Sequence, residues 1–254
     1  MSTPLTLRVV EANARTYRRV WKGTVVTAFV NPILFLLAMG QGLGTLVEQG
    51  VGAVSYIEFL APGLLAATAM QTAATESTWP VMAGMKWRKT YHATLATPVR
   101  IADLVSGNLA WIAVRILMAC AAFGLVTGVL GAAPLERMIL VLPAGVLTGM
   151  AFAAPLIAFT ARAKNENRLS SIFRFVIIPM FLFSGTFFPI TQLPGWLQPV
   201  AYVTPLWHGV DLCRSIALGS ASQTPGLVHI AYLSLWIGAG WWWATTSFRK
   251  KLEL

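Results

Sequence analysis

Lysine and arginine are confined to short stretches that separate long apolar segments of the chain. The sequence holds 254 residues and 19 lysines and arginines, and all but three of these cations lie within positions 8–22, 86–100, 162–174 and 249–251. Membrane proteins collect basic residues in their cytoplasmic connections. Basic charge on every second connection therefore predicts an even number of membrane crossings, with both termini in the cytoplasm.

The composition agrees with a chain that is surrounded by lipid. Hydrophobic residues make up 56% of it and charged residues 11%, and its mean hydropathy is +0.67. Soluble domains carry roughly 25% charged residues. A crossing helix requires about 20 mostly apolar residues, and six segments qualify: 25–44, 57–79, 104–130, 138–160, 171–190 and 227–248. We expect an all-α integral membrane protein with six transmembrane helices in a single domain, residues 1–254.

The net charge of +10 does not indicate a nucleic-acid-binding protein, because the cations are spread over four connections rather than gathered on one face. We expect anionic lipid headgroups to neutralise them. The sequence has no G-x-x-x-x-G-K-[ST], H-E-x-x-H or G-x-S-x-G motif. We expect His92, His208 and His229 to lie apart, and so predict no metal site. Cys120 and Cys213 suggest no disulfide framework.

Residues 1–24 predict an amphipathic helix that lies on the inner membrane surface. One helical face carries Val10, Ala14, Tyr17 and Trp21, and the other carries the cations Arg8, Arg15, Arg18, Arg19 and Lys22. Tyrosine and tryptophan favour headgroup depth, and the cations favour an anionic surface. The alternative is a tail that only sets the orientation of the first span.

The inner connection after the second span, residues 80–103, mixes basic and aromatic side chains. An apolar stripe at helical spacing contains Met85, Trp87, Tyr91 and Leu95, and the flanking positions hold Lys86, Arg88, Lys89 and His92. These charges exclude a membrane crossing. A short helix of this kind in the cytoplasm is suited to docking on a partner protein. The alternative is a solvated loop that only sets the topology.

The outer connection, residues 189–226, is too apolar for an ordinary exposed loop. Prolines at positions 189, 194, 199 and 205 break it into short pieces, and Trp196, Tyr202 and Trp207 favour the membrane interface. We predict two short re-entrant helices that form an outer gate or an extracellular cap. An aromatic cluster at the end of the preceding span, which includes Phe181, Phe187 and Phe188, suits either an apolar substrate or the surrounding lipid.

Polar side chains within two of the predicted spans form a candidate patch inside the membrane. Arg115 lies in the third span, where an unpaired charge costs about 2.5–3.5 kcal/mol. Glu76, near the inner end of the second span, is a candidate partner, and Gln71 extends the same helical face. The patch belongs either to a substrate path or moving interface, or to a static contact between helices.

Short sequence blocks in a fixed order resemble one family of membrane permeases. They are FLAPG at 59–63, TP at 97–98 with Asp103, SGTFFP at 184–189, QLP at 192–194, TPL at 204–206, and Asp211 with Arg214. In this order, and with the predicted spans, they resemble the ABC-2 permeases, in particular the NodJ-like branch near the daunorubicin-resistance permeases. The blocks cover nearly the whole chain.

The resemblance implies a permease subunit that is not itself an enzyme and that holds no cofactor. Two permease chains, the same or related, each dock on a separate P-loop ATPase subunit that binds ATP and Mg, in a bacterial inner membrane. The substrate is a lipid-like compound, a glycolipid or lipo-oligosaccharide, or a hydrophobic drug, and it moves outward.

The same resemblance assigns roles to three groups of residues. Contact with the ATPase falls to the coupling residues Met85, Lys86, Trp87, Arg88, Lys89 and Tyr91. A second contact falls to the interface-helix residues Arg15, Arg18, Arg19 and Trp21. The translocation path and outer gate fall to Phe181, Phe187, Phe188, Trp196 and Trp207.

Two other classes of protein are open alternatives from the residues alone. A secondary transporter driven by an ion gradient needs ionisable groups near the membrane midplane and inverted repeats, and Arg115 is the single such group. A lipid-acting membrane enzyme needs a polar catalytic cluster, and the sequence offers neither paired carboxylates nor a histidine constellation for it.

Overall fold

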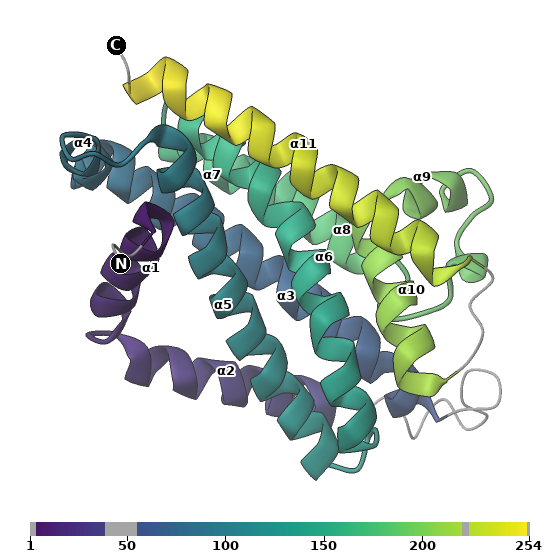
Figure 1. The fold of residues 1–254 in the computed structure, drawn as a ribbon. Helices are drawn as coiled ribbons and strands as arrows, with labels where there is room; N and C mark the ends of the chain where they lie inside the picture. The colour runs from purple at the N-terminus through teal and green to yellow at the C-terminus, as the bar shows by residue number, and fades with distance from the viewer. Residues whose placement is uncertain (1–3, 39–54, 220–223, 253–254) are drawn as a thin grey trace.

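The computed structural model describes residues 4–38, 55–219 and 224–252, and this part of the chain is built from helices (Figure 1). The α-helices are α1 (Leu5–Tyr17), α2 (Trp21–Leu36), α3 (Tyr56–Met82), α4 (Thr90–Leu95), α5 (Ile101–Val129), α6 (Leu135–Arg162), α7 (Glu166–Ile172), α8 (Ile178–Phe183), α9 (Gln198–Val203), α10 (Pro205–Leu218) and α11 (Gly226–Leu252). Two π-helical turns, η2 (Ala83–Trp87) and η3 (Phe173–Ile177), continue α3 and α7, and a 3-10 turn, η4 (Ile190–Gln192), precedes α9.

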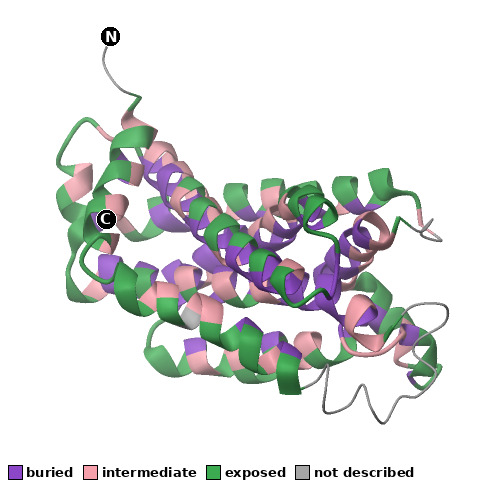
Figure 2. Cartoon of the chain, turned by 90° about the horizontal axis from the view of Figure 1, so that it is seen from below, coloured by how far each residue is buried: buried purple, intermediate pink, exposed green. Residues whose placement is uncertain are grey.

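Helix α6 is the centre of the bundle and packs against α3, α5, α10 and α11. Small residues allow this, because they let helix backbones approach closely. A Cβ added at Gly240 of α11 would lie 2.6 Å from the backbone nitrogen of Pro155, and one at Gly149 of α6 would lie 2.9 Å from the carbonyl oxygen of Ala69. The buried residues accordingly gather along the middle of the bundle (Figure 2).

Three threonine hydroxyls inside the bundle are satisfied by the backbone of their own helices. Thr78, Thr127 and Thr148 are fully buried, and each donates to the backbone carbonyl oxygen four residues earlier in its own helix, at 2.7–2.9 Å. This local bond lets a polar side chain remain in an apolar interior at little cost. Many large apolar residues, including Val129, Leu227, Leu235 and Trp242, instead lie exposed on the outer surface, as expected where lipid is the solvent.

Helix starts follow the local sequence. Ser55 and Glu58 form a reciprocal capping box at the start of α3. Thr204 caps α10 by accepting from the backbone N–H of Trp207, and Pro205 occupies the first position of that helix. Helix α10 packs along α3 and α6, so the outer connection returns into the bundle rather than covering it.

The predicted spans and the observed helices agree for four segments and differ for two. Helices α3, α5, α6 and α11 cover the second, third, fourth and sixth predicted spans. Helix α2 covers the start of the first, whose residues 39–44 lie outside the described residues. The fifth is helical only as far as Phe183, because the chain turns at Gly185 with φ +79°. By length and composition, α5 and α6 are able to cross a membrane, and the count of six crossings stays a prediction.

Candidate functional site

An ion pair joins α3 and α5 inside the bundle. Arg115 Nε donates to Glu76 Oε1 at 2.9 Å, and the two side chains are only 10% and 19% exposed. The pairing predicted from the sequence is therefore confirmed. The pair is held by a charge-assisted hydrogen bond between the guanidinium and the carboxylate.

Tyr17 covers the ion pair from α1. The guanidinium carbon of Arg115 lies 4.2 Å from the centre of the Tyr17 ring, and that ring meets the ring of Trp111 edge-on at 5.7 Å. Helix α1 reaches this position because it rests on α5 at Gly107, where an added Cβ would lie 2.6 Å from Val9. Val9 is thus the buried residue through which the N-terminal helix packs on the bundle.

The N-terminal helix is also shorter than residues 1–24. It ends at Tyr17, and the predicted interface residue Trp21 starts α2 instead. The cations Arg15, Arg18 and Arg19 are exposed, as is Trp21. These four side chains are accessible to lipid or to a partner, and their role stays a prediction.

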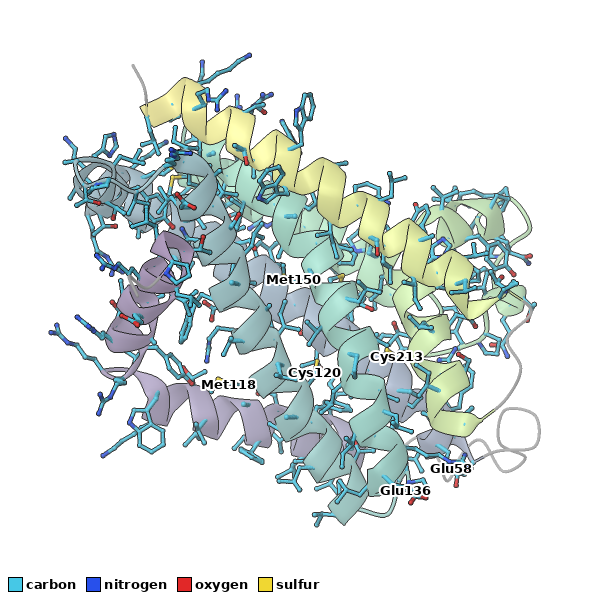
Figure 3. All side chains as sticks on the ribbon, viewed as in Figure 1. Glu58, Met118, Cys120, Glu136, Met150 and Cys213 are labelled. Atoms are coloured by element: carbon cyan, nitrogen blue, oxygen red, sulfur yellow. The ribbon has the colours of Figure 1, made fainter. Side chains whose placement is uncertain are left out.

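Two cavities meet at the ion pair. The inner one, of about 890 Å³, lies between α1, the α4 segment and α5, and the deeper one, of about 770 Å³, lies between α2, α3 and α5. Both are lined by Tyr17, Thr24, Glu76 and Arg115. The helical face of α3 that Gln71 shares with Glu76 lines the deeper cavity, and Thr68, Thr72 and Thr75 extend this polar wall. In Figure 3, Met118 points from α5 towards this cavity, whereas Cys120 points towards α6.

An aromatic cluster closes the far end of the deeper cavity. Phe181 meets Phe187 edge-on at 4.9 Å, and Phe35 of α2 lies 6.3 Å and 5.9 Å from these two rings. The other three predicted path residues lie elsewhere. Phe188 and Trp207 pack against the small core of Ile190, Leu193 and Ala201, and Trp196 is 76% exposed. Of the five predicted path residues, the structure therefore brings Phe181 and Phe187 together at the deeper cavity.

The predicted coupling segment is broken into two pieces. The π-helical turn η2 ends at Trp87, Lys89 adopts the left-handed conformation with φ 51°, and α4 starts at Thr90. The single stripe predicted from spacing is wrong because this break rotates the two pieces relative to each other. Met85 and Tyr91 are buried, whereas Trp87, Arg88 and Lys89 are exposed.

The buried residues of this segment fix it to the bundle. Tyr91 donates to Asn108 Oδ1 at 3.2 Å, and burial raises its pKa, so the hydroxyl keeps its proton. Lys86 Nζ donates to the carbonyl oxygens of Ala163 and Lys164 at 2.8 and 2.6 Å. Burial is the main cause that lowers the pKa of Lys86, and the positive charge of Lys251 lowers it further. The basic connections at 86, 162–164 and 249–251 are thus gathered at one end of the molecule, as the charge pattern implied.

A histidine pair links α10 to α11, and the prediction that His208 and His229 lie apart is wrong. Their Nδ1 atoms are 2.9 Å apart, so one ring donates a hydrogen bond through Nδ1 and the other accepts it. His229 Nε2 lies 3.0 Å from Asp211 Oδ2, close enough for an ion pair but not aligned as a hydrogen bond. Tyr232 stacks on His208 at 3.9 Å. No spacing within one helix signals this pair, because it joins two elements.

Comparison with known proteins identifies the class of molecule. A family model described as ABC-2 type transporter matches residues 5–218. Nodulation protein J of Rhizobium meliloti (strain 1021) is 34% identical over 246 residues, which are 97% of this chain and 93% of the relative. Nodulation protein J of Neorhizobium galegae is 32% identical over 94% of this chain and 91% of the relative. Inner membrane transport permease YadH of Escherichia coli is 23% identical over 80% of this chain and 78% of the relative.

Proposed function

The chain belongs to the ABC-2 type transporter family, the membrane component of a transporter, and we propose that it is the permease subunit of an exporter powered by a separate ATPase chain. The cargo is a lipid-like molecule, a glycolipid or lipo-oligosaccharide, or a hydrophobic drug, and it moves outward across a bacterial inner membrane. Two such chains, identical or related, form the transmembrane unit.

The observation that carries this proposal is the pair of connected cavities. They run from the inner-face segments α1 and α4, past the Glu76–Arg115 ion pair, to the aromatic cluster of Phe35, Phe181 and Phe187. Their walls combine polar groups with apolar and aromatic ones, as sites for amphipathic small molecules do. This arrangement favours a transport path over a static contact between helices.

The exposed residues of the coupling segment are the proposed contact with the ATPase. Trp87 is 53% exposed, and it lies beside the exposed cations Arg88 and Lys89. Exposed aromatic and arginine side chains are those that anchor protein interfaces. Met85, Lys86 and Tyr91 hold the segment on the bundle, so a movement of the ATPase is passed to α3 and α5 rather than absorbed by a loop.

The test is the double variant Trp87→Ala/Arg88→Ala in the complex of the full chain with its ATPase. We expect insertion and ATP hydrolysis to persist, while transport per ATP hydrolysed falls at least about tenfold, since interface anchors contribute about 2 kcal/mol or more. Trp242→Ala, which truncates another exposed tryptophan at 67% exposure, is the matched control. Normal transport by the double variant would refute the contact. Transport that needs no ATPase subunit would refute the proposed function.

A further inference from the structure

Two hydrogen-bond donors remain unused where the two cavities meet. The hydroxyl of Tyr17 is buried, and it has no hydrogen-bond partner within the described part of the chain. Arg115 donates to Glu76 through Nε, and no acceptor among the described residues is found for its two terminal nitrogens. Buried polar groups are nearly always paired. Five buried side-chain atoms in the described part of the chain have no partner, and the Tyr17 hydroxyl is the one among them that lines both cavities.

The geometry of the two groups restricts what would satisfy them. The Tyr17 ring lies over the guanidinium at 4.2 Å, and both groups line both cavities. A guanidinium that has its terminal nitrogens free presents a fork for two oxygens of one group, as a phosphate, sulfate or carboxylate offers. The missing partner is therefore an acceptor with several oxygens that reaches both the Tyr17 hydroxyl and the edge of the Arg115 guanidinium.

The charge around the junction selects an anion over a neutral acceptor. Glu76 balances one positive charge at the ion pair, and the inner cavity adds the cations Arg8 and Arg88 without a further carboxylate among its lining residues. The inner cavity is thus positive overall. An anionic group that enters it is attracted before it reaches the junction.

The deeper cavity has apolar walls that suit a hydrocarbon chain attached to such an anionic group. Its walls include Val25, Phe29, Leu64, Met118 and Phe181, which offer an apolar surface for an alkyl chain. Burying such a chain contributes about 0.8 kcal/mol per CH₂ group. A molecule with its acidic head at the junction and its chain in the deeper cavity would satisfy both regions.

We infer that Tyr17 and Arg115 form a headgroup site for an anionic amphiphile, a single molecule with a phosphate-like head and an apolar chain. The inference deepens the proposed transport function by naming the chemistry of the cargo at this position. The oxygens of the head accept from the Tyr17 hydroxyl and from the terminal nitrogens of Arg115. The ion pair with Glu76 holds the guanidinium in place while the site is empty.

The experiment is photolabelling of the full chain in phosphatidylcholine nanodiscs, without nucleotide, by a dodecyl phosphate that carries a diazirine on its chain. Unlabelled dodecyl phosphate, dodecyl maltoside and inorganic phosphate compete with it, and the labelled peptides are found by mass spectrometry. We expect labelling in α2, α3 or α5, competition by dodecyl phosphate, and far weaker competition by the other two compounds.

Tyr17→Phe is the decisive variant, because it keeps the ring over Arg115 and removes a hydroxyl that has no partner in the folded chain. We expect it to weaken competition by dodecyl phosphate about tenfold, the loss of one hydrogen bond to a charged group. Tyr202→Phe, at a tyrosine of α9 far from the junction, should change nothing. The double variant Glu76→Gln/Arg115→Gln keeps a polar pair and should weaken binding about a hundredfold.

Three results would overturn the inference. Unchanged binding in both Tyr17→Phe and the double variant would exclude the headgroup site. Equal competition by dodecyl maltoside would exclude selection for an anion. Equal competition by inorganic phosphate would show a site for the free ion rather than for an amphiphile. Because binding is measured without the ATPase or nucleotide, its outcome is separate from that of the transport test.

Discussion

The two sides of helix α5 differ in how they are filled. On one side α3, α6, α10 and α11 approach so closely that a single added Cβ would meet backbone atoms. On the other side α1 and α2 leave two cavities, and the unpaired hydroxyl of Tyr17, between themselves and the bundle. The close-packed side resists rearrangement, whereas the open side has the volume and the polar groups that a passing molecule requires.

This difference follows from which residues lie at each contact. Glycine and alanine along α6 and α11 allow contact between backbones, where dispersion interactions are dense. Aromatic and charged side chains along α2, α3 and α5 cannot fill space so evenly. Substitutions that add volume should therefore reduce stability most on the close-packed side. Substitutions that change polarity should affect transport most on the side of the two cavities.

The largest effect on stability is expected at Gly240. Alanine there would place its Cβ 2.6 Å from the backbone nitrogen of Pro155, which no side-chain rotation relieves. We expect Gly240→Ala to lower the free energy of unfolding by about 3 kcal/mol, as overpacking of a tight core does. Gly238→Ala, in the same helix with nothing within 4 Å of its Cβ, is the control. Thermal unfolding in detergent measures both, and equal melting temperatures would contradict the close packing.

His229→Leu is expected to lower the free energy of unfolding by about 2 kcal/mol, because His208 then loses its buried hydrogen-bond partner. The predicted consequence is that α10 loosens from α11 and uncovers the buried Cys213. In a Cys120→Ser background Cys213 is the remaining thiol of the two, and its modification rate by a maleimide reports the change. A rate equal to that of the background protein would show that the pair does not hold α10.

The smallest effect on stability is expected for Glu76→Gln, about 1 kcal/mol, because the amide oxygen still accepts from Arg115. Its effect on transport should be large, at least about tenfold, since the charge at the junction of the two cavities is lost. Glu58→Gln is the matched control, at the start of the same helix and outside both cavities. Loss of stability without loss of transport would make the ion pair a structural contact.

The long helices and the ion pair could be predicted from the sequence because each follows from the cost of exposing polar or charged groups to lipid. Apolar length indicates α3, α5, α6 and α11, and the cost of an unpaired charge in lipid made Glu76 of the second span a candidate partner for Arg115. The position of Tyr17 over that pair could not be predicted. It depends on how α1 rests on Gly107 of α5.

The errors concern places where backbone geometry departs from a regular α-helix. An apolar stripe of Met85, Trp87, Tyr91 and Leu95 was expected, but a π-helical turn and the left-handed Lys89 divide it, and neither has a signature in residue spacing. The fifth predicted span was expected to continue to residue 190, yet the chain turns at Gly185. The pairing of His208 with His229 depends on the packing of α10 on α11, which spacing along the chain does not contain.

The unbroken helix formed by α3 and η2 has a mechanical consequence. It runs from Tyr56 to Trp87, about 48 Å at 1.5 Å per residue. The proposed ATPase contact at Trp87 and the carboxylate of Glu76 therefore sit on the same lever, with no loop between them. A small tilt imposed at Trp87 moves Glu76 relative to Arg115 on the neighbouring helix, so a push at the membrane surface becomes a change in the strength of one ion pair.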